Sequence, residues 1–325
     1  MITLGSMGES IRDGIYKFAF ETYEVAPKIK NMLFDVKTMD GEYKKGMDYV
    51  VDAEALLIDG ETEQARDSQI KRGYPWIIRM RDIRAQISLT KKEMKYGFVD
   101  IPAIGKKLGE AFIEKEEATA ARIFNNGGLT AGDWIFNNSI LGGNDPINDS
   151  SGDLIYDSKA FFDTDHPRTI GDTTYSNFTS NALTADAAGI TNLQSALTLM
   201  EYTNAYDNAG TRIMIRPNLL VVPPSLRFTA EEILTTTQGK PYVATNETNV
   251  MSGILNMVVW PWLDDSDGWF VGQAKKGIEW YDQGSLEIET SYDASQRIWN
   301  VFLTKTIGIG VTNWRYWLSN NISAS

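Results

Sequence analysis

Apolar side chains recur at helical spacing in the first part of the chain. Over residues 7–22 they lie three or four positions apart, which places them on one helix face: Met7, Ile11, Ile15 and Phe18. Pro27 ends this pattern, because proline lacks a backbone donor and clashes with the preceding turn. Residues 28–47 are mixed and punctuated by glycine, which is more typical of an extended arm than of a packed element.

A second, longer helical pattern covers residues 101–126. Asp100 is a favourable N-cap, Pro102 suits the first turn, and Gly127-Gly128 ends the pattern. The apolar stripe repeats every four residues: Ile104, Leu108 and Phe112. Charged residues are expected to cover the remaining surface: Lys106, Lys107, Glu110, Glu114, Lys115, Glu116 and Glu117. About 25 residues at a rise of about 1.5 Å predict a rod of roughly 37 Å, which is long for a globular domain.

Two extended stretches between these helices predict a projecting β-hairpin from about Tyr49 to Ser88. Gly73–Pro75 marks the expected turn, since glycine and proline favour tight turns. The two legs differ in charge: residues 48–63 hold six acids and no base, whereas residues 66–95 hold nine bases and three acids. A two-stranded ribbon is marginal alone, so this one is expected to lie on a neighbouring subunit, with its charges setting the register.

The residues predicted to contact the neighbouring subunit are charged side chains of this hairpin. They are Asp52, Glu54, Glu61, Glu63, Arg66, Arg72, Arg79, Arg81 and Arg84. The basic leg also holds Tyr74 and Trp76, which fits a second hypothesis of nucleic-acid binding by charge and base stacking. Pairing with acidic protein surface is favoured, because the chain supplies 43 acids against 31 bases.

The rest of the chain mixes helices and strands, which indicates an α+β fold. Residues 127–182 are rich in Gly, Asn, Asp, Ser and Thr and predict a long loop with short strands. Helices are expected over residues 185–203, with Thr184 as the cap, and over residues 225–234. The expected strands cover residues 219–222, 254–260, 269–271, 278–280, 286–290 and 298–312.

Composition limits the chemistry of the chain. A net charge of −12 disfavours a general nucleic-acid binder, and the absence of cysteine excludes disulfides and thiolate metal sites. A single histidine in 325 residues argues against most hydrolases and metalloenzymes. Residues 1–9 lack the pattern of a signal peptide, and no run of 18 apolar residues predicts a membrane span. No catalytic group, metal or cofactor is therefore expected.

Two acidic motifs favour structural roles. The only histidine, His166, is expected in a turn with hydrogen bonds to loop backbone, because residues 163–167 offer too few ligands for zinc. Residues 264–268 resemble part of a calcium loop, but Leu263 and Ala274 occupy its first and last ligand positions. A solvated acidic turn is expected there.

The C-terminal third leaves an alternative of another class open. Seven of the nine tryptophans fall there, which suits a sugar-binding cleft with paired carboxylates. Glu287 and Glu289 share one face of a predicted strand, but they alternate with Leu286, Ile288 and Thr290, as on a solvated sheet. A carboxylate-based glycosidase or polysaccharide-binding protein is therefore the weaker hypothesis.

Six sequence blocks follow one another between about residues 85 and 318. They are Ile87–Met94, Ala121–Asn126, Ala160–Pro167, Leu220–Leu226, Val259–Leu263 and Gly268–Phe270. In order and spacing they resemble the Mu-like major head subunit and, more broadly, the tailed-phage major capsid proteins of the Hong Kong 97-type fold.

The resemblance implies an α+β fold with an N-terminal arm, an extended β-hairpin loop, a long spine helix, and peripheral and axial domains. Carried onto this chain, it predicts an arm over 1–48, an extended loop over 49–88, a peripheral domain over 89–184 with the spine helix at 101–126, an axial domain over 185–283, and peripheral-domain return strands over 284–325.

The resemblance also implies a structural protein and no enzyme. Its function would be that of a major capsid protein, which self-assembles through pentamers and hexamers into an icosahedral shell around double-stranded DNA. That DNA would be enclosed without sequence-specific binding. Expected partners are other copies of the chain, a scaffolding protein, a portal and a decoration protein. The protein would belong to the virion and would be assembled in the cytoplasm of a bacterial host. No membrane is expected among its partners.

Overall fold

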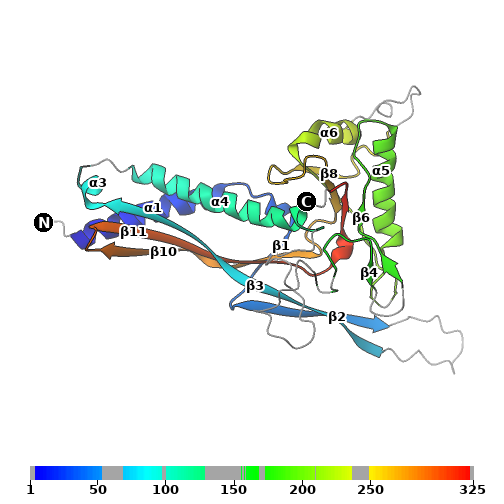
Figure 1. The fold of residues 1–325 in the computed structure, drawn as a ribbon, viewed down its shortest axis with the longest axis horizontal. Coiled ribbons are helices and arrows are strands. Elements are labelled where there is room, and N and C mark those ends of the chain that lie inside the picture. The colour runs from blue at the N-terminus through cyan, green and yellow to red at the C-terminus, as the bar shows by residue number, and fades with distance from the viewer. Residues whose placement is uncertain are drawn as a thin grey trace, which may run out of the picture.

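The computed structural model describes residues 4–52, 69–96, 100–128, 155, 157, 159–167, 173–208, 210–235 and 249–322. Figure 1 shows an elongated molecule in which long strands and two long helices form one end. A second group of helices and short strands forms the other end, near the C-terminus.

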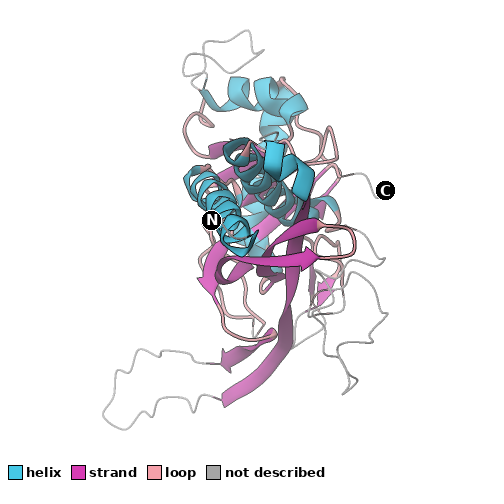
Figure 2. Cartoon of the chain, turned by 90° about the vertical axis from the view of Figure 1, so that its left-hand side faces the viewer, coloured by secondary structure: helices cyan, strands magenta, loops and turns pink. Residues whose placement is uncertain are grey.

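The long sheet has five strands in the order β1–β10–β11–β3–β2. Their bounds are Asp35–Thr38 for β1, Tyr43–Asp52 for β2, Gln69–Thr90 for β3, Ile278–Asp293 for β10 and Ile298–Val311 for β11. Strand β3 changes partner along its length, since residues 69–79 pair with β2 and residues 80–90 pair with β11. The first half of β3 and β2 therefore leave the body as a two-stranded ribbon (Figure 2).

Two long helices, α1 (Leu4–Val25) and α4 (Ile101–Asn125), lie against the long strands. Short helices α2 (Lys30–Leu33) and α3 (Lys91–Tyr96) precede β1 and follow β3. The carboxylate of Asp100 accepts a 3.1 Å hydrogen bond from the N–H of Ala103 and so caps α4, as the sequence predicts. The predicted helices over residues 7–22 and 101–126 are thus confirmed.

Glycines let the two long helices approach each other closely. A Cβ added to Gly105 would lie 2.8 Å from the carbonyl oxygen of Ile15, and one added to Gly109 would lie 2.6 Å from that of Ala19. The helix pair packs on the strands through one apolar cluster, whose buried members are Ile15, Ala19, Tyr23, Leu89, Leu108, Phe112, Leu286, Val301 and Leu303.

The second sheet has the order β6–β12–β9–β7–β8. Its strands are β6 (Phe178–Thr179), β7 (Leu219–Val222), β8 (Asn256–Val259), β9 (Trp269–Gly272) and β12 (Trp317–Asn320). Helix α5 (Ala187–Thr198), which continues into a π-helical turn, and helix α6 (Arg227–Thr235) pack at this end. A separate pair, β4 (His166–Pro167) and β5 (Thr174–Tyr175), lies beside a 3-10 turn over Trp314–Tyr316.

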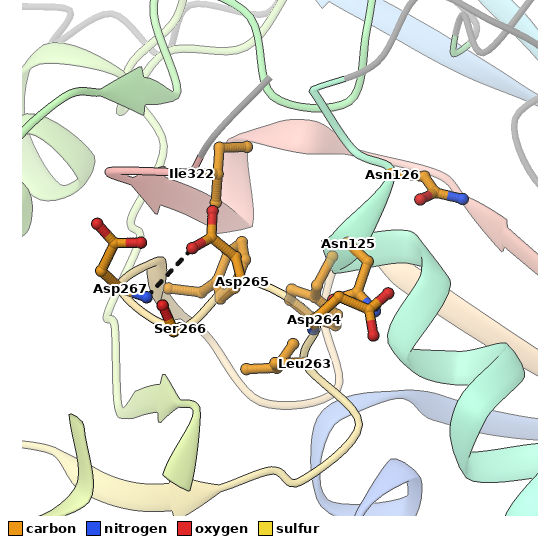
Figure 3. A pocket seen from close by; sticks show the side chains of 10 residues that line it. Asn125, Asn126, Leu263, Asp264, Asp265, Ser266, Asp267 and Ile322 are labelled. Atoms are coloured by element: carbon orange, nitrogen blue, oxygen red, sulfur yellow. Dashed lines mark hydrogen bonds between the residues drawn. The ribbon is translucent and has the colours of Figure 1, made fainter. Parts of the chain in front are cut away.

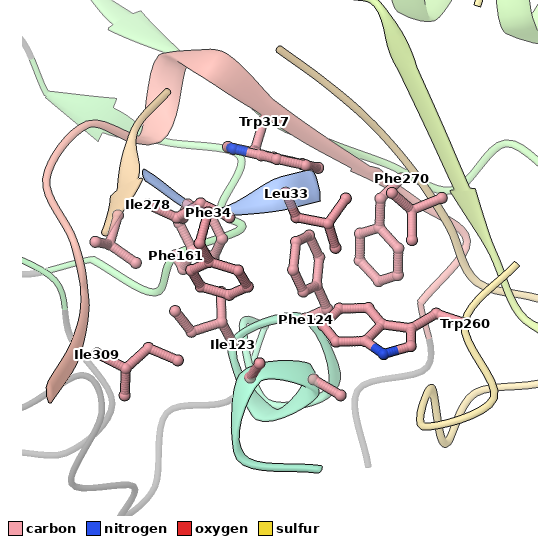
Figure 4. Packing of buried hydrophobic residues seen from close by; sticks show 14 of the residues in the cluster. Leu33, Phe34, Ile123, Phe124, Phe161, Trp260, Phe270, Ile278, Ile309 and Trp317 are labelled. Carbon is pink, nitrogen blue, oxygen red and sulfur yellow. The ribbon is translucent and has the colours of Figure 1, made fainter. Parts of the chain in front are cut away.

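An aromatic core joins the two sheets around Phe124, in the last turn of α4 (Figure 4). Its ring centroid lies 5.0 Å from those of Phe270 and Trp317 and 5.6 Å from that of Trp260. Phe34, just after α2, packs edge-on against the same ring. One helix end therefore anchors segments that lie far apart in the sequence.

Most predicted elements of the C-terminal half are confirmed, with shifted boundaries. The predicted strand over residues 219–222 matches β7. The predicted cap Thr184 is wrong: Asp186 caps α5 by accepting from the N–H of Gly189 at 2.9 Å. The two strands expected at 278–280 and 286–290 form the single strand β10, with a register shift near Gly284.

The predicted turn at Gly73–Pro75 is wrong. These residues lie inside β3, where Met47 pairs with Pro75 and Tyr49 pairs with Arg72. One residue of β2 therefore faces two residues of β3, which is a β-bulge. Bulges accept glycine and a proline without an N–H, so the same residue types that predicted a turn also suit this distortion.

Residues 28–47 are more ordered than the expected arm. They form α2, β1 and the start of β2, and β1 pairs in parallel with residues 279–282 of β10. Of the expected loop over 127–182, the described residues from 155 onward hold the short strands β4, β5 and β6.

Candidate assembly surface and buried charge cluster

The two-stranded ribbon of residues 43–52 and 69–79, here called the β2–β3 projection, has a firmly held base. Ile77 and Ile78 are buried, and Trp76 packs against the aromatic core. The indole of Trp76 also lies across Gly46 of β2, where an added Cβ would meet it at 2.0 Å. Trp76 is therefore a packing residue, which argues against the predicted role in stacking on bases.

The structure places the predicted contact residues unevenly. Glu54, Glu61, Glu63 and Arg66 lie outside the described residues. Asp52 ends β2 opposite Gln69, and Arg72 pairs with Tyr49. Of the acidic leg predicted over residues 48–63, the structure describes only residues 48–52, so the charge separation stays a prediction. The base of β2, which precedes that leg, carries Lys44 and Lys45.

Three predicted arginines follow one another on β3 near the fork where it leaves β2. Arg79 and Arg81 line a hollow of about 660 Å³ together with Tyr43, Ile77 and Thr306. Side chains alternate between the faces of a strand, so Arg84 belongs to the opposite face. Its guanidinium pairs at 2.7 Å with Asp82, which also lines the hollow.

The acidic segment 264–268 forms the expected turn beside the end of α4 (Figure 3). The Asp265 carboxylate accepts hydrogen bonds from the N–H groups of Asp267 and Gly268, at 3.1 and 3.3 Å. Asn125 donates to the Asp264 carboxylate at 2.9 Å. A hydrogen bond with Asp265 raises the pKa of Asp267. Among the described residues, no group of three or more acidic, histidine or cysteine side chains is placed to hold a metal ion.

A cluster of charged side chains is buried where α1, α2, α4, β10 and β11 meet. Glu116 has no exposed surface, and its carboxylate lies 2.8 Å from Nζ of Lys30 and 3.0 Å from Nζ of Lys305. Lys305 also lies 3.0 Å from Asp282, and the hydroxyl of Tyr23 donates to Glu116 at 2.6 Å. These five residues are called the buried charge cluster below.

Burial and charge act against each other in this cluster. Burial alone would raise the pKa of Glu116, but the nearby cations of Lys30 and Lys305 outweigh it, and the pKa is lowered. The same two cations lower the pKa of Asp282 against its burial. Burial lowers the pKa of Lys30 despite the attraction of Glu116. The carboxylates are therefore held ionised, whereas burial makes the charged form of Lys30 less favourable than it is in water.

The neighbouring carboxylate, Glu117, behaves in the opposite way. It accepts a 2.9 Å hydrogen bond from the indole N–H of Trp260 and a 3.2 Å bond from the backbone N–H of Lys30. Burial nevertheless raises its pKa. The sequence prediction that Glu116 and Glu117 face solvent is wrong. Glu116 stands four residues after Phe112 and so continues the apolar stripe, which indicates a buried position. The charge of Glu116 favoured the opposite prediction.

The other motifs take structural roles. His166 is buried and bonded to side chains, so the predicted hydrogen bonds to loop backbone are wrong. Five tryptophans of the C-terminal third are fully buried core residues: Trp260, Trp269, Trp280, Trp314 and Trp317. Glu287 and Glu289 lie exposed on β10, as expected for a solvated strand face. None of the described helices has the length and apolarity to cross a membrane.

Comparison with known proteins gives a consistent result. Residues 86–320 match the family model described as phage capsid protein. The fold is similar to the capsid structure of Cyanophage P-SCSP1u, with a TM-score of 0.56 and 11% identity over 92% of this chain and 89% of that one. It is also similar to a Mycobacterium phage Patience structure, with a TM-score of 0.52 and 12% identity over 100% of this chain and 89% of that one. The bacteriophage JBD30 capsid gives a TM-score of 0.51 and 16% identity over 74% of this chain and 92% of that one. The comparison with curated proteins gives no match.

Proposed function

Because this chain belongs to the phage capsid protein family, we infer that it is a major capsid protein, many copies of which form the head shell of a phage. The observation that carries this conclusion is the family match, which spans residues 86–320 and so most of the body of the molecule. The protein is a structural component of a virion. We propose further that the shell is icosahedral and encloses double-stranded DNA without sequence-specific contacts.

The finer assignment is a Hong Kong 97-type fold of the Mu-like group. Helix α4 corresponds in length and position to the proposed spine helix, and the β2–β3 projection corresponds to the proposed extended loop. The remaining proposed divisions are an arm over 1–48, a peripheral domain over 89–184, an axial domain over 185–283 and return strands over 284–325. The cluster of α5, α6 and the second sheet supports the axial assignment.

The proposed role of the projection is to lie on a neighbouring subunit. A two-stranded ribbon buries little surface by itself, so a neighbour would supply the contacts that its outer part lacks. Arg79 and Arg81 would attract acidic surface of that neighbour, and the net charge of −12 makes such surface abundant. Each contact is weak, but closure of a shell multiplies it.

A second contact surface is proposed on the axial domain. Phe228 on α6 is 76% exposed and Met214 is 73% exposed, which is unusual for large apolar side chains. Val250 and Ile254 are also exposed close to α6 in the fold. A ring of identical subunits needs two different surfaces on each copy, and these side chains would supply one of the two to a second copy of the chain.

Further partners are proposed from the family assignment alone. A scaffolding protein would guide assembly in the cytoplasm of the bacterial host, a portal would occupy one vertex, and a decoration protein would bind the outer shell. Expansion of a precursor shell would be a change between two packings of the same subunits.

The direct test is electron microscopy and sedimentation of the purified chain. Shells, pentamers or hexamers are expected. A monomer or dimer under all assembly conditions would refute the proposal and return attention to the glycosidase alternative, which the comparisons do not support and which the burial of the tryptophans disfavours.

Charge reversal tests the role of the projection separately. Arg79→Glu combined with Arg81→Glu is expected to reduce shell yield and to make assembly more salt-sensitive, because like charges would then meet. Arg79→Gln with Arg81→Gln removes charge without reversal and should have a smaller effect. Lys91→Glu combined with Lys92→Glu, exposed on α3 outside the projection, is the matched control. Equal yields for all variants at every salt concentration would exclude electrostatic guidance by these residues.

A further inference from the structure

Strand β10 is paired along its length on one side but over only a few residues on the other. Strand β11 pairs with β10 from Ile278 to Asp293, whereas β1 pairs only with residues 279–282. Within the described part of the chain, no strand pairs with the outer side of residues 284–293, here called the β10 edge. Figure 1 shows this half of β10 along the border of the elongated end. Its outward N–H and C=O groups are therefore available to another strand.

Strand β2 has an open side of the same kind. It pairs with β3 from Tyr43 to Asp52, and no second strand among the described residues pairs with it. This outer side is called the β2 edge below. The two edges match in length, since β2 has 10 residues and residues 284–293 of β10 are equally many. An open edge of this length is a template for pairing with another chain.

The two edges carry opposite charges. Glu287 and Glu289 are exposed and share one face of β10, because side chains alternate along a strand. Lys44 and Lys45 are exposed on β2. Among the described residues, none of these four side chains forms an ion pair, and the ammonium of Lys45 lies 4.9 Å from the ring centroid of Tyr43. All four charges are therefore available to a partner.

These charges favour one edge pair over the others. Two β10 edges brought together would set Glu287 and Glu289 against carboxylates, and two β2 edges would set lysines against lysines. Like charges on facing strands destabilise the pair, whereas opposite charges stabilise it. The β2 edge therefore fits the β10 edge and rejects a copy of itself.

One chain cannot make this pair with itself. The order of the long sheet is β1–β10–β11–β3–β2, so two other strands separate β2 from β10. The face of β10 that carries the glutamates is also fixed, because Leu286 is buried and Ile288 packs against the same apolar cluster. A second copy of the chain can supply the missing strand.

We propose that the β2 edge of one copy adds to the β10 edge of the next, so that the long sheets of neighbouring subunits are continuous. This inference rests on the proposed function, because it names the surface on which a neighbour's projection lies. Main-chain hydrogen bonds would hold the two strands together, and the lysines and glutamates would select the partner. Each copy uses its β2 edge toward one neighbour and its β10 edge toward another, as a closed assembly of identical subunits requires.

Positive charge extends from the β2 edge onto the neighbouring strand. Lys45 lines the same hollow as Arg79 and Arg81 of β3. The acidic surface that these arginines would attract is then identified: it is the face of a neighbour's β10 that carries Glu287 and Glu289.

The chain has no cysteine, so an introduced pair reports on a single contact. Four double variants of the full chain join one cysteine on each edge: Lys44→Cys or Lys45→Cys with Glu287→Cys or Glu289→Cys. Facing residues of paired strands meet the requirement of a disulfide, whose Cα atoms lie about 4.4–6.8 Å apart. After assembly and mild oxidation, at least one pair should give a ladder of covalent multimers on non-reducing gels. Lys91→Cys with Glu289→Cys, which places the first cysteine on exposed α3, is the matched control and should stay monomeric.

Electron microscopy of the same samples separates this proposal from the proposed function. Shells that show no crosslink in any of the four variants would overturn the edge contact and leave the capsid function standing. A wild type that forms no shells would refute the capsid function and this contact with it. A crosslinked dimer from Glu289→Cys alone would place two β10 edges together and would also overturn the proposal.

Charge exchange tests the contact where a cysteine pair prevents assembly. Lys44→Glu with Lys45→Glu should abolish shells, and Glu287→Lys with Glu289→Lys should do the same. A chain with all four substitutions exchanges the charges of the two edges and should form shells again. Normal shell yield from either double variant, or no recovery in the fourfold variant, would overturn the selection of partners by these charges.

Discussion

Replacement of Glu116 by glutamine tests the buried charge cluster most directly. Glutamine keeps the shape of the side chain but removes the charge that faces two lysines. Lys305 retains Asp282 at 3.0 Å, whereas the ion pair between Lys30 and Glu116 at 2.8 Å is lost. Lys30 is only 1% exposed and cannot reach water without rearrangement. Lys30 then keeps only the ring of Trp280, whose centroid lies 3.8 Å from its Nζ, and the attraction of Asp282. The cost of the substitution is therefore mainly the cost of one buried cation that has lost its ion-pair partner.

The loss in free energy of unfolding has an expected size and an upper limit, which is set by deprotonation of Lys30. Breaking a buried pair by removing one partner costs about 3–5 kcal/mol. Lys30 can escape by losing its proton, and its pKa is already lowered by burial. For an ordinary lysine with a pKa of about 10.4, neutralisation at pH 7 costs about 4.6 kcal/mol, at about 1.36 kcal/mol per unit. At pH 9 the same step costs about 1.9 kcal/mol, so the effect of Glu116→Gln should shrink with rising pH.

The assay is urea unfolding of the purified subunit at pH 7 and pH 9, followed by the fluorescence of its buried tryptophans. Glu114→Gln, exposed on the same helix, is the matched control and should change the free energy of unfolding by no more than about 0.5 kcal/mol. A loss below about 1 kcal/mol for Glu116→Gln at pH 7, or an equal loss at both pH values, would refute the reasoning about the lost ion pair of Lys30.

Three further predictions follow from the same structure. Gly109→Leu should separate α1 from α4 and lower the thermal midpoint, since an added Cβ already lies 2.6 Å from the carbonyl of Ala19; an unchanged midpoint would contradict this close contact. Phe228→Glu should reduce shell yield while leaving the circular dichroism of the subunit unchanged, whereas Phe228→Leu should assemble normally; normal yield for both would exclude this surface from assembly. The stabilisation from ionised Glu116 should be fully present above the pKa of an unfolded glutamate, about 4.3, and should be lost as the pH falls through the lowered pKa of the folded protein. Glu116→Gln should therefore flatten the acid part of a plot of urea midpoint against pH. Parallel plots for wild type and variant would contradict this prediction.

Local signals in the sequence predicted the elements that depend on local chemistry. Asp100 begins α4, because an N-cap acceptor acts through its own backbone neighbourhood. The apolar run of β7 likewise predicted a buried strand at its correct bounds. Gly73–Pro75 misled for the same local reason, since a bulge and a turn make similar demands on glycine and proline, and only the pairing partner distinguishes them.

The candidate sites depend on contacts that no local pattern specifies. Glu116 continues an apolar stripe, but its burial is acceptable only because Lys30 and Lys305 arrive from elements far away in the sequence. His166 is similar, since its partner Asn177 lies across a β4–β5 pair and is itself held by the C-terminal strand. In the sequence, the only sign of the buried cluster is that Glu116 stands at the spacing of the apolar stripe. Only the tertiary fold shows that this position is buried and which cations pair with it.

The position of the buried charge cluster links the core to the proposed assembly surface. Apolar contacts between helices and a sheet tolerate some sliding, whereas a buried charge is compensated in few arrangements. Lys305 pairs across the sheet with Ile83 of β3, the strand that continues through Arg81 and Arg79 into the β2–β3 projection. Because Glu116 holds Lys305 against α4, the ion pair fixes the register and direction of β3 relative to that helix. The proposed contact between the projection and a neighbouring subunit requires the projections to leave every subunit in the same direction, and a buried ion pair at this junction is a physical means of achieving that.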